Sequence, residues 1–161
     1  MPWSFLNRKK HFEMTVKSYD ERVKFYEKRF DELDIGKCGK ISRETVAEIL
    51  KEQAEELDQL MVILLFEQFD LNNDKFIDKN EFVMFCTEME KYSEREILRK
   101  IFDIVDTDHN QRLDVDEVQK LGSLMGLDVT MSDAWATVAT LDKNHDNSID
   151  FEEFCAIIGQ L

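Results

Sequence analysis

The stretch DTDHNQRLDVDE, residues 106–117, decides the fold of this chain of 161 residues. Side chains that carry oxygen stand at its first, third, fifth, ninth and twelfth positions, and the aliphatic Leu113 stands at the eighth. Apolar residues recur at helical spacing before it, in ILRKIFDIV, and a second helical pattern follows it. The stretch therefore predicts a polar loop between two helices.

The same pattern recurs along the chain with a fixed period. It is repeated in DLNNDKFIDKNE (70–81) and DKNHDNSIDFEE (142–153), and in a weaker form in DIGKCGKISRET (34–45). A fixed period of helix, loop and helix indicates a repeated supersecondary unit. A chain with one Pro and five Gly is expected to be mostly helical. The loops begin 36 residues apart, at Asp34, Asp70, Asp106 and Asp142, and seven residues later each has an aliphatic residue, Ile41, Ile77, Leu113 or Ile149.

The oxygen atoms of three of these loops suit a calcium ion. Calcium takes about six or seven oxygen ligands, from loop positions 1, 3, 5 and 9, the backbone carbonyl at position 7 and a bidentate glutamate at position 12. The alternative, acidic turns at helix ends, requires this pattern to arise three times by chance. We therefore predict three Ca²⁺ sites, with Mg²⁺ as a competitor. The predicted ligands are Asp70, Asn72, Asp74, the carbonyl of Phe76, Asp78 and Glu81 in the first site, Asp106, Asp108, Asn110, the carbonyl of Arg112, Asp114 and Glu117 in the second, and Asp142, Asn144, Asp146, the carbonyl of Ser148, Asp150 and Glu153 in the third.

The loop at residues 34–45 lacks most of these ligands. Positions 3, 5 and 12 are Gly36, Cys38 and Thr45, so no bidentate carboxylate remains. We predict that this loop binds no calcium and has a structural role, with Ile41 pairing against Ile77 in a short two-stranded link. The alternative is a weak site made of backbone oxygens alone.

Position 6 of a calcium loop favours glycine because the backbone there needs a positive φ. The three intact loops have Lys75, Gln111 and Asn147 at this position. Asn tolerates left-handed geometry best, whereas Lys and Gln each cost about 1–2 kcal/mol of backbone strain. The aspartates at position 9 add negative charge that attracts the ion, and the sequence does not decide which effect wins.

The spacing and the paired loops resemble calmodulin and troponin C, of the EF-hand family, over about residues 18–158. The segment SEREILRKIFDIVDTDHNQRLDVDEV (93–118) looks like the third hand of calmodulin. The resemblance implies an all-α fold of four EF-hand helix–loop–helix units in two paired lobes, each with a short two-stranded antiparallel β link between its loops. The expected parts are an N-terminal extension at 1–17, a lobe at 18–90 and a lobe at 91–161. The chain departs from calmodulin in its first loop, in the missing position-6 glycines and in the extension.

The resemblance also implies a function. Calcium would open each lobe through the glutamates at position 12 and expose an apolar groove that binds an amphipathic helix of a target protein. A buffer that opens little is the alternative. We expect no enzymatic activity, because the chain has no nucleophile–base constellation, Gly-rich phosphate loop or zinc motif. The expected groove residues are Leu60, Leu64, Phe69, Phe82, Met84 and Phe85 in the first lobe, and Phe102, Val105, Leu121, Leu124, Met125, Val138, Phe154 and Ile157 in the second.

Composition limits the partners and the location. A formal net charge of -14 disfavours nucleic acid and stable membrane insertion, and the longest apolar run, LMVILLF (60–66), is too short to span a bilayer. No signal peptide is visible, and three cysteines without a CxxC pair favour a reducing compartment. We expect a cytoplasmic monomer.

Residues 1–17 differ from the rest of the chain. Four basic residues against one acidic residue give them a net charge of +3, and aromatic residues such as Trp3 and Phe5 lie among the basic ones. One hypothesis is that this arm docks on the protein's own groove or on an anionic partner or surface. The alternative is a frayed extension of the first helix.

Several helix boundaries can also be predicted. Ser18 with Glu21, and Ser93 with Glu96, form capping-box patterns, and Thr130-Met-Ser-Asp133 has a related form. The segment 82–105 has no Gly or Pro, so it is either one long helix or two helices that break near residues 91–93.

Overall fold

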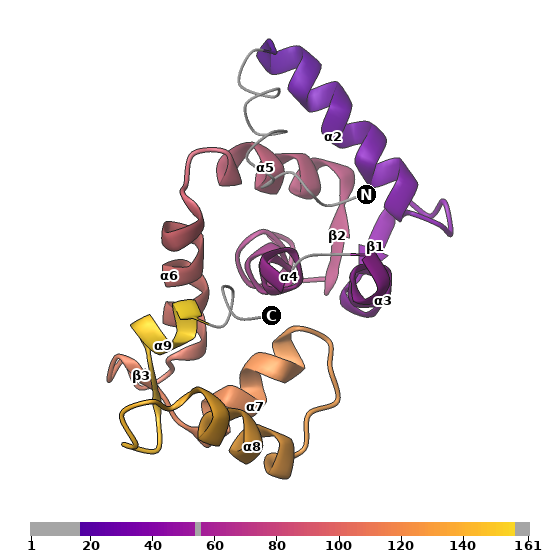
Figure 1. Ribbon diagram of the computed structural model, residues 1–161. Helices are drawn as coiled ribbons and strands as arrows, with labels where there is room; N and C mark the ends of the chain where they lie inside the picture. The colour runs from indigo at the N-terminus through magenta and orange to yellow at the C-terminus, as the bar shows by residue number, and fades with distance from the viewer. Residues whose placement is uncertain (1–16, 54–55, 157–161) are drawn as a thin grey trace. The chain divides into compact units, whose positions relative to one another are not determined.

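The computed structural model describes residues 17–53 and 56–156. Within these ranges helices are joined by loops and short strands, and the chain divides into two compact units at Glu94 and Arg95. Each unit contains two helix–loop–helix repeats and one two-stranded antiparallel sheet (Figure 1). The predicted all-α fold of paired helix–loop–helix units is therefore confirmed.

In the first unit the outer helices α2 and α5 pack together, as do α3 and α4. The rings of Phe30 in α2 and Phe82 in α5 lie 5.8 Å apart between their centroids. The hydroxyl of the buried Tyr26 donates a hydrogen bond of 2.6 Å to Glu90, directly after α5. The elements are α2 (Tyr19–Leu33), β1 (Lys40–Ser42), α3 (Arg43–Gln53), α4 (Glu56–Gln68), β2 (Phe76–Asp78) and α5 (Lys79–Met89).

In the second unit α7 packs against α8, and α6 packs against α9 through aromatic rings. The ring centroids of Phe102 in α6 and Phe154 in α9 lie 5.5 Å apart. The elements are α6 (Glu94–Val105), β3 (Arg112–Leu113), α7 (Val115–Leu124), α8 (Met131–Leu141), β4 (Ile149–Asp150) and α9 (Phe151–Ala156).

The two sheets join the loops of each unit through the aliphatic residue at position 8. Ile41 of β1 pairs with Ile77 of β2, and Leu113 of β3 pairs with Ile149 of β4. All four side chains are buried. The predicted link between Ile41 and Ile77 is confirmed, and it ties the loop at 34–45 to the loop at 70–81.

Helix boundaries follow the local capping chemistry. The Ser18 hydroxyl accepts a hydrogen bond from the Glu21 N–H at 3.3 Å, and the Thr130 hydroxyl accepts one from the Asp133 N–H at 3.2 Å. Both capping boxes are complete, as predicted. In the segment that the sequence left open, α5 ends at Met89 and α6 begins at Glu94, so the chain forms two helices there.

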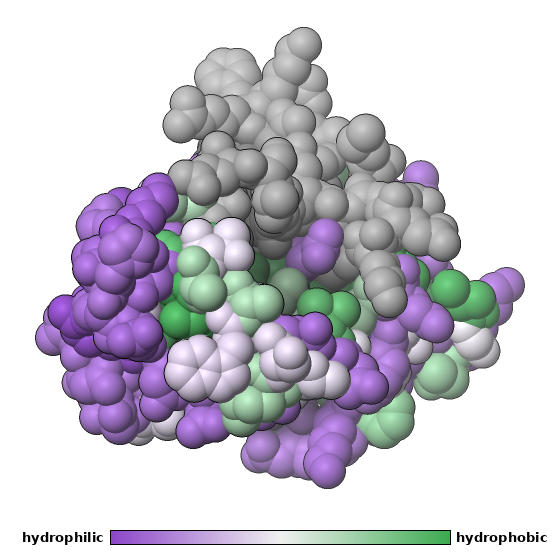
Figure 2. Space-filling view, turned by 60° about the horizontal axis from the view of Figure 1, so that its bottom comes forward, coloured by the Kyte–Doolittle hydropathy of each residue, from purple (hydrophilic) through white to green (hydrophobic). Residues whose placement is uncertain are grey.

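The run LMVILLF (60–66) lies in α4, and every one of its side chains is buried. A helix that is apolar all round belongs in a protein core, and no helix in the described part of the chain is long and apolar enough to cross a membrane. On the face drawn in Figure 2, hydrophilic side chains make up a large part of the coloured surface, and apolar residues reach it in smaller groups. Apolar residues such as those of this run fill the core, and six acidic residues at loop positions 1 and 12 are buried as well.

The residues predicted to line an apolar groove are mostly core residues in this structure. Met84 is the most exposed of them, at 49% of its surface, and Phe69, Leu121, Leu124 and Met125 are partly exposed. Ile157 lies outside the described residues, as do residues 1–16 of the predicted N-terminal extension. The buried members of the set are Leu60, Leu64, Phe82, Phe85, Phe102, Val105, Val138 and Phe154.

Gly122 in α7 gives the first prediction. A Cβ atom placed there would lie 2.3 Å from Cγ2 and 2.9 Å from Cβ of Val129. Gly122→Ala should therefore lower the free energy of unfolding of the metal-free protein by about 1–2 kcal/mol in urea titrations, because the overpacking outweighs the better helix propensity of Ala. Gly36→Ala is the control, since its Cβ would meet only Cys38 Sγ at 3.9 Å. Unchanged stability of the Gly122 variant would contradict this account.

Candidate metal centres

All four loops are organised around the aspartate at position 1. In the loop 106–117, Asp106 accepts a hydrogen bond from the N–H of Asn110 at 3.1 Å and another from the N–H of Gln111 at 2.9 Å. Asp34, Asp70 and Asp142 each accept the same two bonds from the fifth and sixth residues of their loops. The turn is thus folded around a carboxylate, whether or not the loop has a full set of oxygen ligands.

The turn needs left-handed backbone at two positions in each loop. At position 6 the φ angles of Lys75, Gln111 and Asn147 are 66°, 66° and 64°, so the predicted positive φ is confirmed. At position 4 the φ angles of Asn73, His109 and His145 are 55°, 56° and 62°. The sequence reasoning missed position 4. The signal was in the residue types, because Asn and His are enriched among non-glycine residues with positive φ.

The glutamate at position 12 closes each intact loop. One oxygen of Glu117 accepts the N–H of Thr107 at 2.7 Å, and the other accepts the N–H of Asp114 at 3.1 Å. Glu81 and Glu153 make the equivalent bonds to positions 2 and 9 of their loops. These glutamates are buried, at 5% to 7% exposure. Burying a carboxylate is costly unless it is hydrogen-bonded, and the loop backbone supplies those bonds.

The same glutamates also cap the helices that leave the loops. Asp114 is the N-cap of α7 and accepts the Glu117 N–H at 2.9 Å, while Glu117 bonds back to the Asp114 N–H. Asp78 and Glu81 form the same capping box at α5. The sequence reasoning assigned positions 9 and 12 to the metal alone. The Asp-x-x-Glu spacing, a capping-box pattern, was the signal it did not use.

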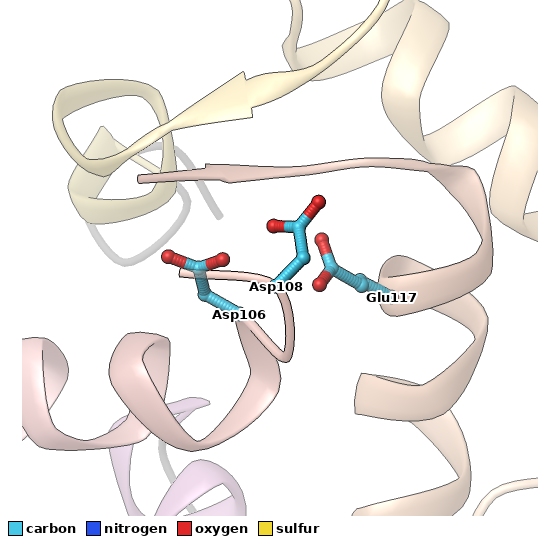
Figure 3. Close-up of side chains that lie close together, drawn as sticks. All are labelled: Asp106, Asp108 and Glu117. Carbon is cyan, nitrogen blue, oxygen red and sulfur yellow. The ribbon is translucent and has the colours of Figure 1, made fainter. Parts of the chain in front are cut away.

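The loop 106–117 brings three carboxylates together. Oxygen atoms of Asp106, Asp108 and Glu117 all lie within 4.8 Å of one another. Figure 3 shows Asp106 and Asp108 on the loop after α6 and Glu117 on α7, with the carboxylates facing a common space. Like charges this close repel one another unless a cation or protons lie between them. Clustered carboxylate oxygens are the donors that a hard cation such as calcium prefers, so this donor set fits the predicted ion.

The other two intact loops have an amide at position 3. Asn72 and Asn144 accept the N–H of position 5, at 2.9 Å and 3.0 Å, as Asp108 does at 3.1 Å. Position 7 stands where the loop enters its strand: Phe76 and Arg112 begin β2 and β3, and Ser148 directly precedes β4. The backbone turn of these loops thus matches that of 106–117, but among the described residues only Asp106, Asp108 and Glu117 form a group whose ligand atoms all lie within 4.8 Å of one another.

The loop 34–45 keeps the turn but not the donors. Its Cys38 thiol donates a hydrogen bond to the Lys40 carbonyl at 3.1 Å, so the position-7 carbonyl already has a partner. Burial raises the pKa of Asp34, but hydrogen bonds from the Gly39 and Cys38 N–H groups outweigh that effect and the pKa is lowered. Position 12 is Thr45, whose N–H and hydroxyl contact Ser42. No side chain closes this loop as the glutamates close the others.

A basic side chain at position 7 of the first loop in each unit reaches the carboxylate at position 5 of the second. Lys40 forms an ion pair with Asp74, and Arg112 forms one with Asp146. The hydrogen bond from Lys40 lowers the pKa of Asp74 and raises the pKa of Lys40. The sequence analysis did not find these contacts, because they depend on how two loops are placed side by side.

Comparison with protein families gives two matches along this chain. The model of the EF-hand domain pair matches residues 22–87 and residues 95–159. Each match covers both loops of one pair, so together they include all four loops described above.

Individual proteins are similar over most of the chain. Probable calcium-binding protein CML31 of Arabidopsis thaliana is 31% identical over 134 residues, which are 78% of this chain and 90% of that protein. Calmodulin-like protein 3 of the same plant is 26% identical over 128 residues, 78% of this chain and 84% of that protein. Calcium-dependent protein kinase 22, also of Arabidopsis thaliana, is 27% identical over 139 residues, 86% of this chain. The chain spans only 28% of the length of that kinase.

The left-handed residues at position 6 give the second prediction. Replacing Gln111 by Gly removes about 1–2 kcal/mol of left-handed strain and adds about 0.5–1 kcal/mol of chain entropy in the unfolded state. The metal-free protein should therefore gain about 0.5–1 kcal/mol of unfolding free energy. Asn147→Gly is the matched control and should bring no gain, because Asn tolerates this conformation while the entropy cost of Gly is the same. Equal gains in both variants, measured by urea unfolding, would show that side-chain strain is not the cause.

Proposed function

Because the chain belongs to the EF-hand domain pair family, we propose that it is a calmodulin-like calcium sensor that binds Ca²⁺ and then engages a target protein. The observation that carries the proposal is the convergence of Asp106, Asp108 and Glu117 in a loop between two helices. Two relatives whose names refer to calcium binding or to calmodulin, CML31 and calmodulin-like protein 3, support it.

We propose three calcium ions, one in the first unit and two in the second, held by the ligands given in the sequence analysis. The support is the shared frame of the three intact loops, in which a buried glutamate at position 12 accepts the N–H groups of positions 2 and 9. A bidentate glutamate suits the larger, flexible coordination of calcium, whereas Mg²⁺ demands near-octahedral geometry and keeps several waters. Mg²⁺ would therefore compete more weakly at these loops.

The proposed switch acts through the glutamates at position 12. Each stands in the first turn of the helix that leaves its loop, and one of its oxygens already accepts the N–H of position 2. A bound calcium ion would supply charge that draws both oxygens of the carboxylate. The glutamate would give up its hydrogen bonds to the two N–H groups and bind the ion instead. This change would shift the exit helix relative to the entry helix.

Opening would have to uncover residues that are now in the core. Aromatic residues of the helices, such as Phe85, Phe102 and Phe154, are buried in this structure. If the exit helices shift, these residues would form the groove for an amphipathic helix of the target. Because the Met-rich groove of calmodulin is not reproduced, we propose a narrower range of targets.

A buffer remains the second candidate, and one observation favours it. The three glutamates already contact the entry ends of their loops. A loop that is closed before the ion binds needs less movement of the exit helix, and a buffer opens little. The two functions differ in whether calcium exposes apolar surface.

We propose no enzymatic activity for this chain. Proteins of the calmodulin-like EF-hand type are generally not enzymes, and the match to the kinase covers only part of that protein. The proposed location is the cytoplasm, supported by the three free cysteines Cys38, Cys86 and Cys155. Docking of the basic N-terminal arm remains a hypothesis, since most of that segment lies outside the described residues.

The number of sites is the third prediction. Calorimetric titration with Ca²⁺ should give three ions per chain, and Glu81→Gln, Glu117→Gln and Glu153→Gln should each remove one, since each loses a bidentate ligand. Thr45→Ala is the matched control at position 12 of the loop 34–45 and should leave the count unchanged. Four ions bound by the unmodified protein would refute the structural role given to that loop.

The fourth prediction separates the sensor from the buffer. Fluorescence of a hydrophobic dye and binding of a basic amphipathic helical peptide should both rise when calcium replaces chelator. The double variant Glu117→Gln/Glu153→Gln should lose the part of the response that comes from the second unit. Three bound ions with no calcium-dependent change in either signal would establish the buffer and exclude the sensor.

A further inference from the structure

Each unit contains the same kind of ion pair between its two loops. The ammonium group of Lys40 pairs with the carboxylate of Asp74, and the guanidinium group of Arg112 pairs with the carboxylate of Asp146. Arg112 also donates a hydrogen bond of 3.2 Å to the hydroxyl of Ser148. In both units the basic residue is at position 7 of the first loop, and the acidic residue is at position 5 of the second.

The strand register explains why both contacts form. Lys40 stands opposite Asp78 in the first sheet, and Arg112 stands opposite Asp150 in the second. These partners are at position 9 of their loops, and a long side chain that leaves the strand reaches back to the carboxylate at position 5. The exposures match as well, at 48% and 30% for the first pair and 48% and 29% for the second. The contact is a repeated feature of the loop pair.

In each unit only the first loop supplies a basic side chain to the other loop. The reciprocal residues, at position 7 of the second loops, are Phe76 and Ser148, which carry no charge. The carboxylates of Asp74 and Asp146 are therefore neutralised from the neighbouring loop, while the loop 106–117 receives no such cation from Ser148. The loop 34–45, which lacks the donors for an ion of its own, thus still delivers a positive charge to the loop beside it.

We propose that Lys40 and Arg112 are tethered competitors of the metal ion in the loops 70–81 and 142–153. This proposal rests on the proposed function, in which Asp74 and Asp146 are calcium ligands. A cation held on a ligand carboxylate repels an incoming Ca²⁺ and occupies an oxygen that the ion needs. Calcium must release the side chain before it gains the carboxylate, so each tethered cation lowers the affinity of the loop that it faces.

The competitor also sets an order of filling within the second unit. The position-7 residue that faces the loop 106–117 is the uncharged Ser148, so this loop should fill first. The carbonyl of Arg112 is a proposed ligand of that loop, while its side chain holds Asp146 of the other. One residue therefore takes part in both sites of the unit. The loop 142–153 fills only after its aspartate has exchanged the guanidinium group for the ion.

The first unit is tested in the background Glu117→Gln/Glu153→Gln, which leaves the loop 70–81 as the only working site. Lys40→Gln in this background should tighten calcium binding about two- to fivefold by calorimetry, the range expected for a partly exposed ion pair. Lys91→Gln is the charge-matched control, because Lys91 pairs with Glu88, and both residues lie outside the loop 70–81. It should change the affinity less, and high salt should shrink the difference.

The second unit is tested in the background Glu81→Gln/Glu117→Gln, which leaves the loop 142–153. Arg112→Gln should raise its calcium affinity by a similar factor, since the carbonyl at this position is retained. Arg99→Gln is the matched control, because Arg99 pairs with Asp103 within α6, outside both loops. Circular dichroism of each metal-free variant checks that the helices remain.

The outcomes distinguish the tethered competitor from the proposed calcium binding. Tighter binding in both position-7 variants than in their controls supports the tethered competitor. Calcium binding that is equal in the variant and its control overturns the competitor and leaves the calcium sites standing. No calcium binding in either background or in the unmodified chain overturns the proposed function itself, and with it the competitor.

Discussion

The hydrogen bonds that the aspartate at position 1 accepts from the N–H groups of positions 5 and 6 are the constraint on which each loop depends. They turn the chain around a carboxylate, and this turn needs left-handed residues at positions 4 and 6. It then sends position 7 into the strand and position 8 into the core, as Leu113 shows. The glutamate at position 12 can bond back to position 2 only because the chain has been turned in this way.

The loop 34–45 shows that the shape of the turn and its charge are separable. Asp34 makes both of its backbone bonds, Gly39 has a φ of 78°, and Ile41 joins the sheet. Positions 3, 5, 9 and 12 are Gly36, Cys38, Ser42 and Thr45, so no second carboxylate at these positions repels that of Asp34. Backbone bonds hold the turn, and under the proposed function the added oxygen-bearing side chains turn it into a metal centre.

The sequence predicted what depends on local pattern and on the repeat. The fixed period located all four loops, the aliphatic position 8 predicted the pairing of Ile41 with Ile77, and the capping boxes at Ser18 and Thr130 located helix starts. It could not decide the break between α5 and α6, where no Gly or Pro marks the end. There the Tyr26 hydroxyl contacts Glu90, a residue 64 positions away. Contacts across such distances leave no trace in a local pattern.

The cross-loop ion pairs were out of reach for the same reason. The distance from Arg112 to Asp146 along the chain says nothing about contact until the strand register is known, and a shift of one residue would turn the side chain to the other face. The capping role of the position-12 glutamates was missed for a different reason. The Asp-x-x-Glu spacing indicates a capping role, but the same residues also fit a metal-binding pattern, and only that pattern was considered. For residues with two roles, a single sequence pattern predicts only one of them.

Under the proposed function, two interactions between the loops of the second unit have opposite effects on the binding of the second ion. The pairing of Leu113 with Ile149 fixes the strands together, so an ordered first loop favours order in the second. The side chain of Arg112 places a positive charge on Asp146, which opposes the second ion. In the first unit the loop 34–45 supplies the strand and the opposing charge of Lys40 but no ion of its own. The same frame therefore gives coupled sites in one unit and a single restrained site in the other, through residues that are not themselves side-chain ligands.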